Sequence, residues 1–278
     1  MTGPIAVVVA MEAELRHFFA QTPVIQEARD GIWQDRWVEI GGQPVVVVRS
    51  GMGVAVAAAA TERVIDAHSP AAVVNYGCAG AHRRDVMPGD VVIGERYVNH
   101  TRLQILPTGE ERYVGMKYEV SGEPFVTADL AADPHLLDVT TSVAATYRPE
   151  PWPRDLFWPE TIPYRPPVVH SGTVVSADIW TQSHERLDVL HGRHDSLCED
   201  METASVAQIC ALHGVPFVSI KDISNSEYHR ASDVAEFTDF PTAEVGRRAA
   251  GLALRVIEEL VREGERGERP SPPAAARG

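Results

Sequence analysis

Short runs of valine and isoleucine alternate with amphipathic stretches along most of the chain. The apolar runs lack the every-second-residue alternation of half-exposed strands, so they are typical of strands that are buried on both faces. The stretches between them have the period and the end signals of helices. The pattern therefore predicts an α/β fold in which helices cover both faces of a central sheet.

The clearest predicted strands are residues 5–9, 44–49, 72–76, 90–93, 168–175 and 216–221. The predicted helices are residues 12–20, 54–68, 184–194, 201–213 and 243–262. Neither an internal repeat nor an interdomain linker interrupts this series, so we expect one domain over residues 1–263. Residues 264–278 are charged and then rich in Pro, Ala and Gly, a composition that predicts a disordered tail.

The chain is acidic, with 25 Lys and Arg against 39 Asp and Glu and a net charge of −14. This balance argues against a nucleic-acid partner, because such binding depends on basic side chains that neutralise phosphates. Cys78, Cys198 and Cys210 are too few and too scattered for a disulfide framework or a zinc site. The apolar start at residues 5–10 is too short for a membrane span. We therefore expect a cytoplasmic protein without a membrane partner.

One segment differs in composition from the rest. Residues 149–167 hold seven of the twenty prolines and two of the five tryptophans. Proline prevents regular helix, so this insertion is expected to be a stiff, irregular loop. Its exposed aromatic side chains favour a wall of the active site or a subunit contact, with simple surface packing as a weaker alternative.

Two glycine-rich segments follow predicted strands. Ser50–Gly53 opens an alanine-rich helix, where backbone N–H groups can bind an anion or a sugar hydroxyl. It fits neither the dinucleotide fingerprint nor a P-loop, so NAD and ATP have little support, and a ligand-free turn stays open. Asn75–Gly80 is read as a second such turn, and together the two mark a crevice for a small ligand. Cys78 within it is more readily a small turn residue than a nucleophile.

Three histidines lie close together around a predicted helix, at positions 184, 191 and 194. Their spacing does not match a zinc-binding helix, so a solvated helix face is favoured and no metal is expected. The sequence also has no Gly-x-Ser-x-Gly motif, so serine hydrolase chemistry has no support.

Six motifs occur in order along the chain: Ala10–Glu14, Ser50–Gly53, Asn75–Gly80 with Pro88–Val92, Val175–Asp178, Glu199–Ala204, and Val215–Val218 followed by Asp222–Asn225. Together they resemble the purine nucleoside phosphorylase and uridine phosphorylase superfamily. Within it, the 5'-methylthioadenosine/S-adenosylhomocysteine nucleosidases are most similar. The resemblance extends from about Ile5 to the final helix.

The resemblance implies a three-layer α/β/α fold with a mixed central β-sheet. It also implies a homodimer that cleaves the bond between ribose and the base of a purine nucleoside, as in nucleoside catabolism. This reaction needs no metal and no organic cofactor. The expected partner is thus a small-molecule nucleoside.

Residue roles follow from the same resemblance. Glu12 corresponds to the glutamate that activates the attacking water, and Glu12→Gln is expected to lower the rate by two or more orders of magnitude. Met201 and Glu202 correspond to the pair that binds the ribose. Trp180 falls where an aromatic ring stacks on the base, and the Thr181 backbone falls where the base edge is read.

Four further positions complete the predicted site. Gly53 belongs to the first glycine-rich segment, and Cys78 replaces the usual serine near the sugar. Lys221 stands where an arginine is expected. Asn225 stands where nucleosidases for adenine substrates carry an aspartate that donates a proton to N7. An asparagine cannot be a general acid, but it can bind N7 and donate to a 6-oxo group, which favours a 6-oxopurine nucleoside.

These roles are chemically reasonable without the family. Breaking an N-ribosyl bond develops positive charge on the sugar and negative charge on the base, so a carboxylate, a held water and a donor at the base are needed. Each residue also has a simpler interpretation. Glu12 could stabilise a helix N-terminus, Glu202 could face solvent, and Trp180 could be an ordinary core residue.

A phosphate-dependent phosphorylase is the first alternative function. A carboxylate at Glu12 would repel phosphate, which favours water as the nucleophile, whereas Arg83 and Arg84 beyond the second glycine-rich segment keep phosphorolysis open. The second alternative is a binding or storage protein without catalysis, against which Glu12 and Glu202 argue. The sequence therefore favours a purine nucleoside N-ribohydrolase.

Overall fold

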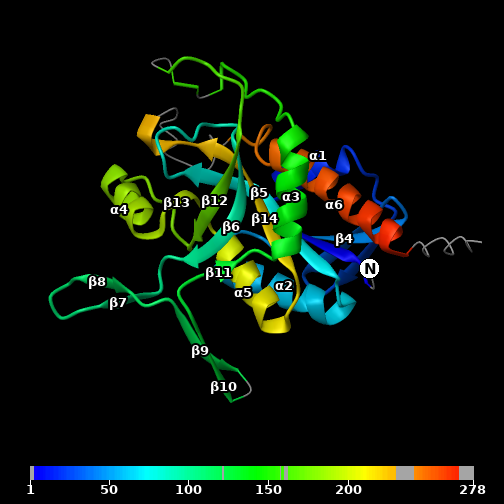
Figure 1. Cartoon of the computed structure of the whole chain (residues 1–278), viewed down its shortest axis with the longest axis horizontal. Helices are drawn as coiled ribbons and strands as arrows, with labels where there is room; N and C mark the ends of the chain where they lie inside the picture. Colours follow the sequence, from blue (N-terminus) through cyan, green and yellow to red (C-terminus); the bar gives the residue numbers. More distant parts are fainter. Residues whose placement is uncertain (1–2, 121, 157, 160–161, 230–240, 269–278) are drawn as a thin grey trace, which may run out of the picture.

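The computed structural model describes residues 3–120, 122–156, 158–159, 162–229 and 241–268 (Figure 1). Its main sheet contains ten strands, and nine of them follow the order β11-β6-β12-β13-β5-β1-β4-β3-β2. In chain order the ten are β1 Ile5–Val9, β2 Gln26–Asp30, β3 Trp33–Ile40, β4 Gln43–Arg49, β5 Ala72–Ala81, β6 Val91–Asn99, β11 Leu130–Ala131, β12 Val169–Ser176, β13 Ser196–Asp200 and β14 Phe217–Asn225.

The sheet is mixed and partly closed. β1 runs parallel to β4 and β5, whereas β13 runs antiparallel to β5. β14 pairs with β5 on one side and β6 on the other, so β6, β12, β13, β5 and β14 form a closed ring. The predicted α/β fold with a mixed central sheet is thus confirmed.

Helices cover both faces of the sheet (Figure 1). They are α1 Glu12–Phe19, α2 Val54–His68, α3 Pro134–Thr146, α4 His184–His194, α5 Thr203–His213 and α6 Arg247–Glu268, with a short 3-10 helix η1 at Glu227–His229. The alternation of side chains along β1 sends Ile5, Val7 and Val9 toward α1, α3 and α6. Ala6 and Val8 face α2 and α5 on the other side. Two apolar cores therefore sandwich the sheet.

Two hairpins extend from this body (Figure 1). One pairs β7 Leu103–Ile105 with β8 Glu111–Tyr113, and the other pairs β9 Met116–Val120 with β10 Glu123–Thr127. Neither was among the predicted elements, because these strands are short and contain no long apolar run. No helix in the described ranges has both the length and the apolar character to cross a lipid bilayer.

Three predicted elements have the limits that the structure shows. The strand at 5–9 and the helices at 54–68 and 184–194 have the predicted limits. Asn75–Gly80 was predicted to form a turn. In the structure it belongs to the second half of β5. α6 continues to Glu268, so residues 264–268 of the predicted tail are helical, and residues 269–278 lie outside the described residues.

The proline- and tryptophan-rich insertion at 149–167 packs on the body of its own chain. Trp152 is fully buried, and the Arg248 guanidinium of α6 lies 4.9 Å from its ring centroid. Arg248 also donates to the carbonyl oxygens of Glu150 and Pro151 at 2.6 and 2.9 Å. Among its described residues, none lines the main pocket. The prediction that this segment walls the site is therefore wrong for those residues.

We predict that Trp152→Ala lowers the free energy of unfolding by about 3 kcal/mol, because it leaves a cavity beside a buried guanidinium. Trp158→Ala in the same segment is the control, since this side chain is only half-buried. Urea denaturation of both variants measures the difference. Equal losses would show that Trp152 has no special part in fixing the segment.

Candidate active site

A pocket lies where the carboxyl ends of β5, β13 and β14 meet the start of α1. The empty space within it, counted together with open solvent at its mouth, is about 760 Å³. Most of its lining is apolar or small, but five acidic side chains also face it: Glu14, Glu199, Asp200, Glu202 and Glu227. None of the described residues lining it is a lysine or an arginine.

Glu14, and not Glu12, is the glutamate of the first motif that lines the pocket. Positions 12 and 14 point to nearly opposite sides of α1, because successive helical residues are rotated by about 100°. The Glu12 side chain is 53% exposed and pairs with Arg36 at 2.9 Å and Arg49 at 3.4 Å. The role predicted for Glu12 is therefore wrong, and Glu14 occupies the position that this role requires.

Backbone N–H groups hold both oxygens of the Glu14 carboxylate. Cys78 N–H donates to Oε1 at 2.7 Å, and Met11 N–H donates to Oε2 at 2.9 Å. A Cβ on Gly77 would lie only 2.8 Å from Oε1, so glycine is required for this close approach. Burial raises the pKa of Glu14, although these bonds and the charge of Lys221 oppose the shift.

Glu202 approaches the pocket from the turn before α5. This helix begins at Thr203 and not at residue 201, so Met201 and Glu202 both precede it and line the pocket. Gly53 N–H donates to Glu202 Oε1 at 2.7 Å. Gly53 has a φ of +110°, and a Cβ there would lie 2.8 Å from Asp178 Oδ1. Gly53 of the first glycine-rich segment thus positions a carboxylate from outside the pocket, whereas Met52 of the same segment lines it.

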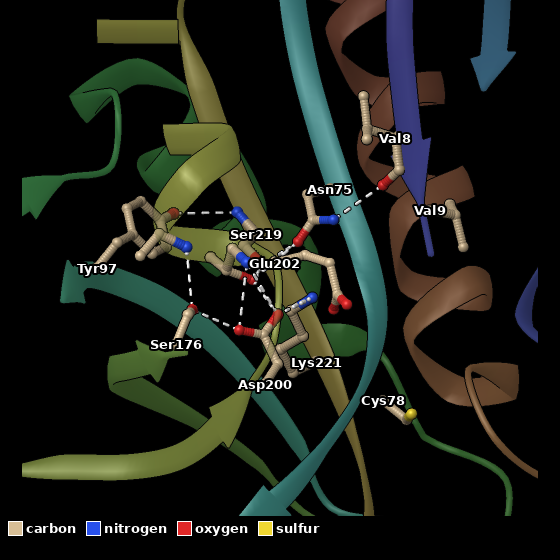
Figure 2. A network of polar contacts seen from close by, with 12 residues as sticks. Val8, Val9, Asn75, Cys78, Tyr97, Ser176, Asp200, Glu202, Ser219 and Lys221 are labelled. Atoms are coloured by element: carbon tan, nitrogen blue, oxygen red, sulfur yellow. Dashed lines mark hydrogen bonds and ion pairs between the residues drawn. The ribbon is translucent and has the colours of Figure 1, made fainter. Parts of the chain in front are cut away.

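A buried polar network supports this turn from behind (Figure 2). Lys221 Nζ lies 2.8 Å from Asp200 Oδ2, and the two side chains are 2% and 1% exposed. Asp200 also accepts from Thr203 N–H at the start of α5 and from Ser176 Oγ–H. Lys221 therefore does not line the pocket but fixes the carboxylates that do.

The carboxylates raise one another's proton affinity. Burial, followed by the charge of Asp200, raises the pKa of Glu202 to about 8. Burial alone would lower the pKa of Lys221, but Asp200, Glu202 and Glu14 outweigh it and raise that pKa. The lysine thus stays charged at the centre of an acidic cluster.

Trp180, Thr181, Glu199 and Asn225 also line the pocket. Trp180 is half-buried and lines the cavity, so the interpretation as an ordinary core residue is not needed. Thr181 N–H and Oγ–H donate to Glu199 at 3.1 and 3.0 Å. The Asn225 amide donates to Glu227 at 3.1 Å and accepts from the Ser224 hydroxyl at 2.9 Å.

Cys78 lines the pocket but does not behave as a nucleophile. Burial, followed by the charge of Glu14, raises the pKa of its thiol well above the ordinary value. The thiol therefore stays protonated, since no positive charge lowers its pKa enough. Its contribution to the site is the backbone N–H that holds Glu14.

Six predicted site residues line the pocket: Cys78, Trp180, Thr181, Met201, Glu202 and Asn225. Gly53 and Lys221 contact its carboxylates from outside, and Glu12 does not line it. Four acidic residues that line the pocket were not predicted as site residues: Glu14, Glu199, Asp200 and Glu227. Spacing with Leu15 and Phe18 on the buried face of α1 could have indicated Glu14, whereas no local signal identifies Glu199.

The remaining candidates lie elsewhere. Over the described parts of the chain, no group of three or more His, Cys, Asp or Glu side chains is placed to hold a metal ion. His194 is buried, so the predicted solvated face of α4 does not include it. Arg83 pairs with Asp85 at 2.6 Å, and the Arg84 guanidinium lies 4.4 Å from the Tyr228 ring centroid. Neither arginine lines the pocket.

Comparison with known proteins gives consistent results. A sequence model of the phosphorylase superfamily matches residues 4–262. A 5'-methylthioadenosine/S-adenosylhomocysteine nucleosidase of Exiguobacterium sp. is 30% identical over 224 residues, 80% of this chain and 83% of its own. The Bacillus subtilis protein of the same name is 28% identical over 226 residues, 80% and 84% of the two chains.

Two solved structures share the fold. The Neisseria meningitidis nucleosidase of that name, in complex with methylthio-immucillin-A, has a TM-score of 0.71 and 24% identity over 92% of this chain and 99% of its own. The futalosine hydrolase of Helicobacter pylori has a TM-score of 0.70 and 20% identity over 94% and 97% of the two chains.

We predict that Glu202→Gln raises thermal stability, and more so as the pH rises. An unfolded glutamate loses its proton above about pH 4.5, whereas native Glu202 keeps it to about pH 8, so native stability falls across this window. Glutamine removes that loss. The expected rise in melting temperature is at least about 3 °C at pH 9 and smaller at pH 5, and differential scanning calorimetry measures it.

Exposed Glu12→Gln serves as the control and should leave the melting temperature nearly unchanged at both values of pH. A Glu202→Gln variant less stable than the wild type at pH 9 would contradict the argument.

Proposed function

The chain belongs to the phosphorylase superfamily, and on that premise we propose that it is a purine nucleoside N-ribohydrolase. In this reaction water attacks the anomeric carbon of the ribose, the bond to the base breaks, and free base and free sugar leave. The relatives named as methylthioadenosine/S-adenosylhomocysteine nucleosidases support this reaction type.

The charge of the pocket is the observation that carries the proposal. Five carboxylic side chains and, among the described residues, no lysine or arginine line it. Enzymes that bind inorganic phosphate use positive side chains or free backbone N–H groups. Here the backbone N–H groups of Met11, Gly53 and Cys78 already bind carboxylates. Water is therefore the better nucleophile than phosphate, and the phosphorylase alternative is not favoured.

Glu14 supplies the general base. Its two oxygens are fixed by backbone donors, and its raised pKa gives it a higher proton affinity than an exposed glutamate. A water beside this carboxylate loses a proton to it as the C–O bond forms. The electron pair of the broken C–N bond goes to the base, which takes up a proton on release.

Glu202 binds the sugar and Trp180 binds the base. One oxygen of Glu202 is held by Gly53, so the other is placed to accept from ribose hydroxyls. Those donors lower the pKa of Glu202 from about 8 and favour its charged form, which stabilises the positive sugar in the transition state. The Trp180 ring stacks on the base, and Asn225 binds its N7 edge.

Three parts of the proposal concern the protein as a whole. The partner is a small purine nucleoside and not a macromolecule. The homodimer implied by the family and the cytoplasmic location stay predictions. Size-exclusion chromatography with light scattering tests the dimer, and a molar mass near 30.4 kDa would contradict it.

We predict that the purified protein releases free base and unphosphorylated sugar from purine nucleosides in phosphate-free buffer. Chromatography of the products formed with and without added phosphate tests this. Strict phosphate dependence with a sugar phosphate as product would establish the phosphorylase instead.

We predict that Glu14→Gln lowers kcat by at least about 100-fold, because glutamine cannot accept the proton from water. Glu12→Gln is the matched control two residues away and should retain near-normal turnover. Wild-type kcat/KM should also fall as the pH drops through a pKa above the ordinary 4.5 of a glutamate. Near-normal activity in Glu14→Gln would remove Glu14 from the mechanism.

A further inference from the structure

We propose that Glu199 makes one edge of the base subsite a hydrogen-bond acceptor, so that the enzyme selects purines with a hydrogen on N1, the 6-oxopurines. The base subsite is the part of the pocket lined by Trp180, Thr181, Glu199 and Asn225. This inference rests on the proposed function and specifies its substrate class.

Strand register places two polar side chains on either side of one glycine. Gly80 of β5 is the register partner of Asn225 on β14 and of Glu199 on β13. Adjacent strands lie about 4.8 Å apart, so the backbones of Asn225 and Glu199 are about 10 Å apart across Gly80. Gly80 has no side chain to fill this gap, and all three residues line the pocket. A flat base fits there with one edge toward each polar residue.

The backbone donor expected to read the base edge is already used. The resemblance assigned this reading to the Thr181 backbone, whose N–H could donate to the unprotonated N1 of adenine. In the structure Thr181 N–H donates to Glu199 Oε2 at 3.1 Å, and Thr181 Oγ–H donates to Oε1 at 3.0 Å. The subsite therefore presents a carboxylate oxygen where the family pattern would present a donor.

The Glu199 carboxylate is held in its charged form. His100 Nε2 lies 2.8 Å from Oε1 and His82 Nε2 lies 3.7 Å from Oε2, and both rings are buried. Burial alone would raise the pKa of Glu199, but the two histidines outweigh it and hold that pKa at about 2. Ionised carboxylates only accept hydrogen bonds, so Glu199 cannot serve N1 of adenine.

Glu199 Oε2 has fewer close polar neighbours than Oε1, so Oε2 is the oxygen that we assign to the ligand. Oε1 faces two groups, His100 and Thr181 Oγ, whereas Oε2 has one close donor, Thr181 N–H. Buried His82 Nε2 also lines the pocket and has no hydrogen-bond partner among the described residues. A 6-oxopurine offers its N1–H to Oε2 and its oxygen to the Asn225 amide, so both flanking residues favour the same bases.

Binding of free bases tests the inference without relying on catalysis. We expect calorimetry on the full chain to give hypoxanthine an affinity at least about tenfold higher than adenine. 1-Methylhypoxanthine, which keeps the 6-oxo group but lacks N1–H, should also bind at least about tenfold more weakly than hypoxanthine. Adenine binding as tightly as hypoxanthine, or no binding of either base, would overturn the inference.

Glu199→Gln separates this residue from Asn225. The change preserves size but adds a donor, so the hypoxanthine-to-adenine affinity ratio should fall at least about tenfold. Exposed Glu185→Gln is the control and should leave the ratio unchanged. An unchanged ratio in a folded Glu199→Gln protein would assign the selectivity to Asn225 alone. If that variant does not fold, the ranking of the three bases by the wild type decides.

The nucleoside assay distinguishes this inference from the proposed function. Faster hydrolysis of adenosine than of inosine, together with tighter adenine binding, would keep the hydrolase and overturn the role of Glu199. Preferential hypoxanthine binding without cleavage of any nucleoside would keep the base selectivity and overturn the hydrolase.

Discussion

The buried ion pair between Lys221 and Asp200 is the interaction on which the site depends. Three carboxylates, those of Glu14, Asp200 and Glu202, approach one another in a region from which water is almost excluded. Burying such charges is costly unless an opposite charge and hydrogen bonds compensate. Lys221 supplies that charge from within the sheet, and Asp200 in turn binds Thr203 N–H at the start of α5. Without this pair, the turn that carries Glu202 would lose its support.

Backbone N–H donors also fix the positions of the pocket carboxylates, and these donors need no reorganisation during a reaction. Glu14 is held by N–H groups of Met11 and Cys78, and Glu202 by that of Gly53. Glycine at 77 permits the close approach of the Glu14 carboxylate, and glycine at 53 permits that of Asp178. The arrangement lowers stability, because the raised pKa values of Glu14 and Glu202 record how unfavourable their charged forms are. A site of this kind gives up stability for placement of charge.

The sequence predicted the layered fold because both faces of strands such as β1 are buried, which leaves a continuous apolar run. Five of the six motifs identified in the sequence also contribute residues to one pocket. The prediction named the wrong glutamate of the first motif, because a motif match does not say which side of a helix faces the pocket. The buried face of α1 contains Glu14, Leu15 and Phe18, and that spacing excludes position 12.

The base subsite could not be predicted, because it depends on pairing between segments far apart in the chain. β13 is only five residues long and was not predicted, and its antiparallel register against β5 places Glu199 beside Gly80. The second half of β5 was itself taken for a turn. The sequence motifs alone would assign the choice of base to Asn225 only. Once the strands are paired, Asn225 and Glu199 flank the same glycine, so base selectivity becomes a property of the sheet and not of one residue.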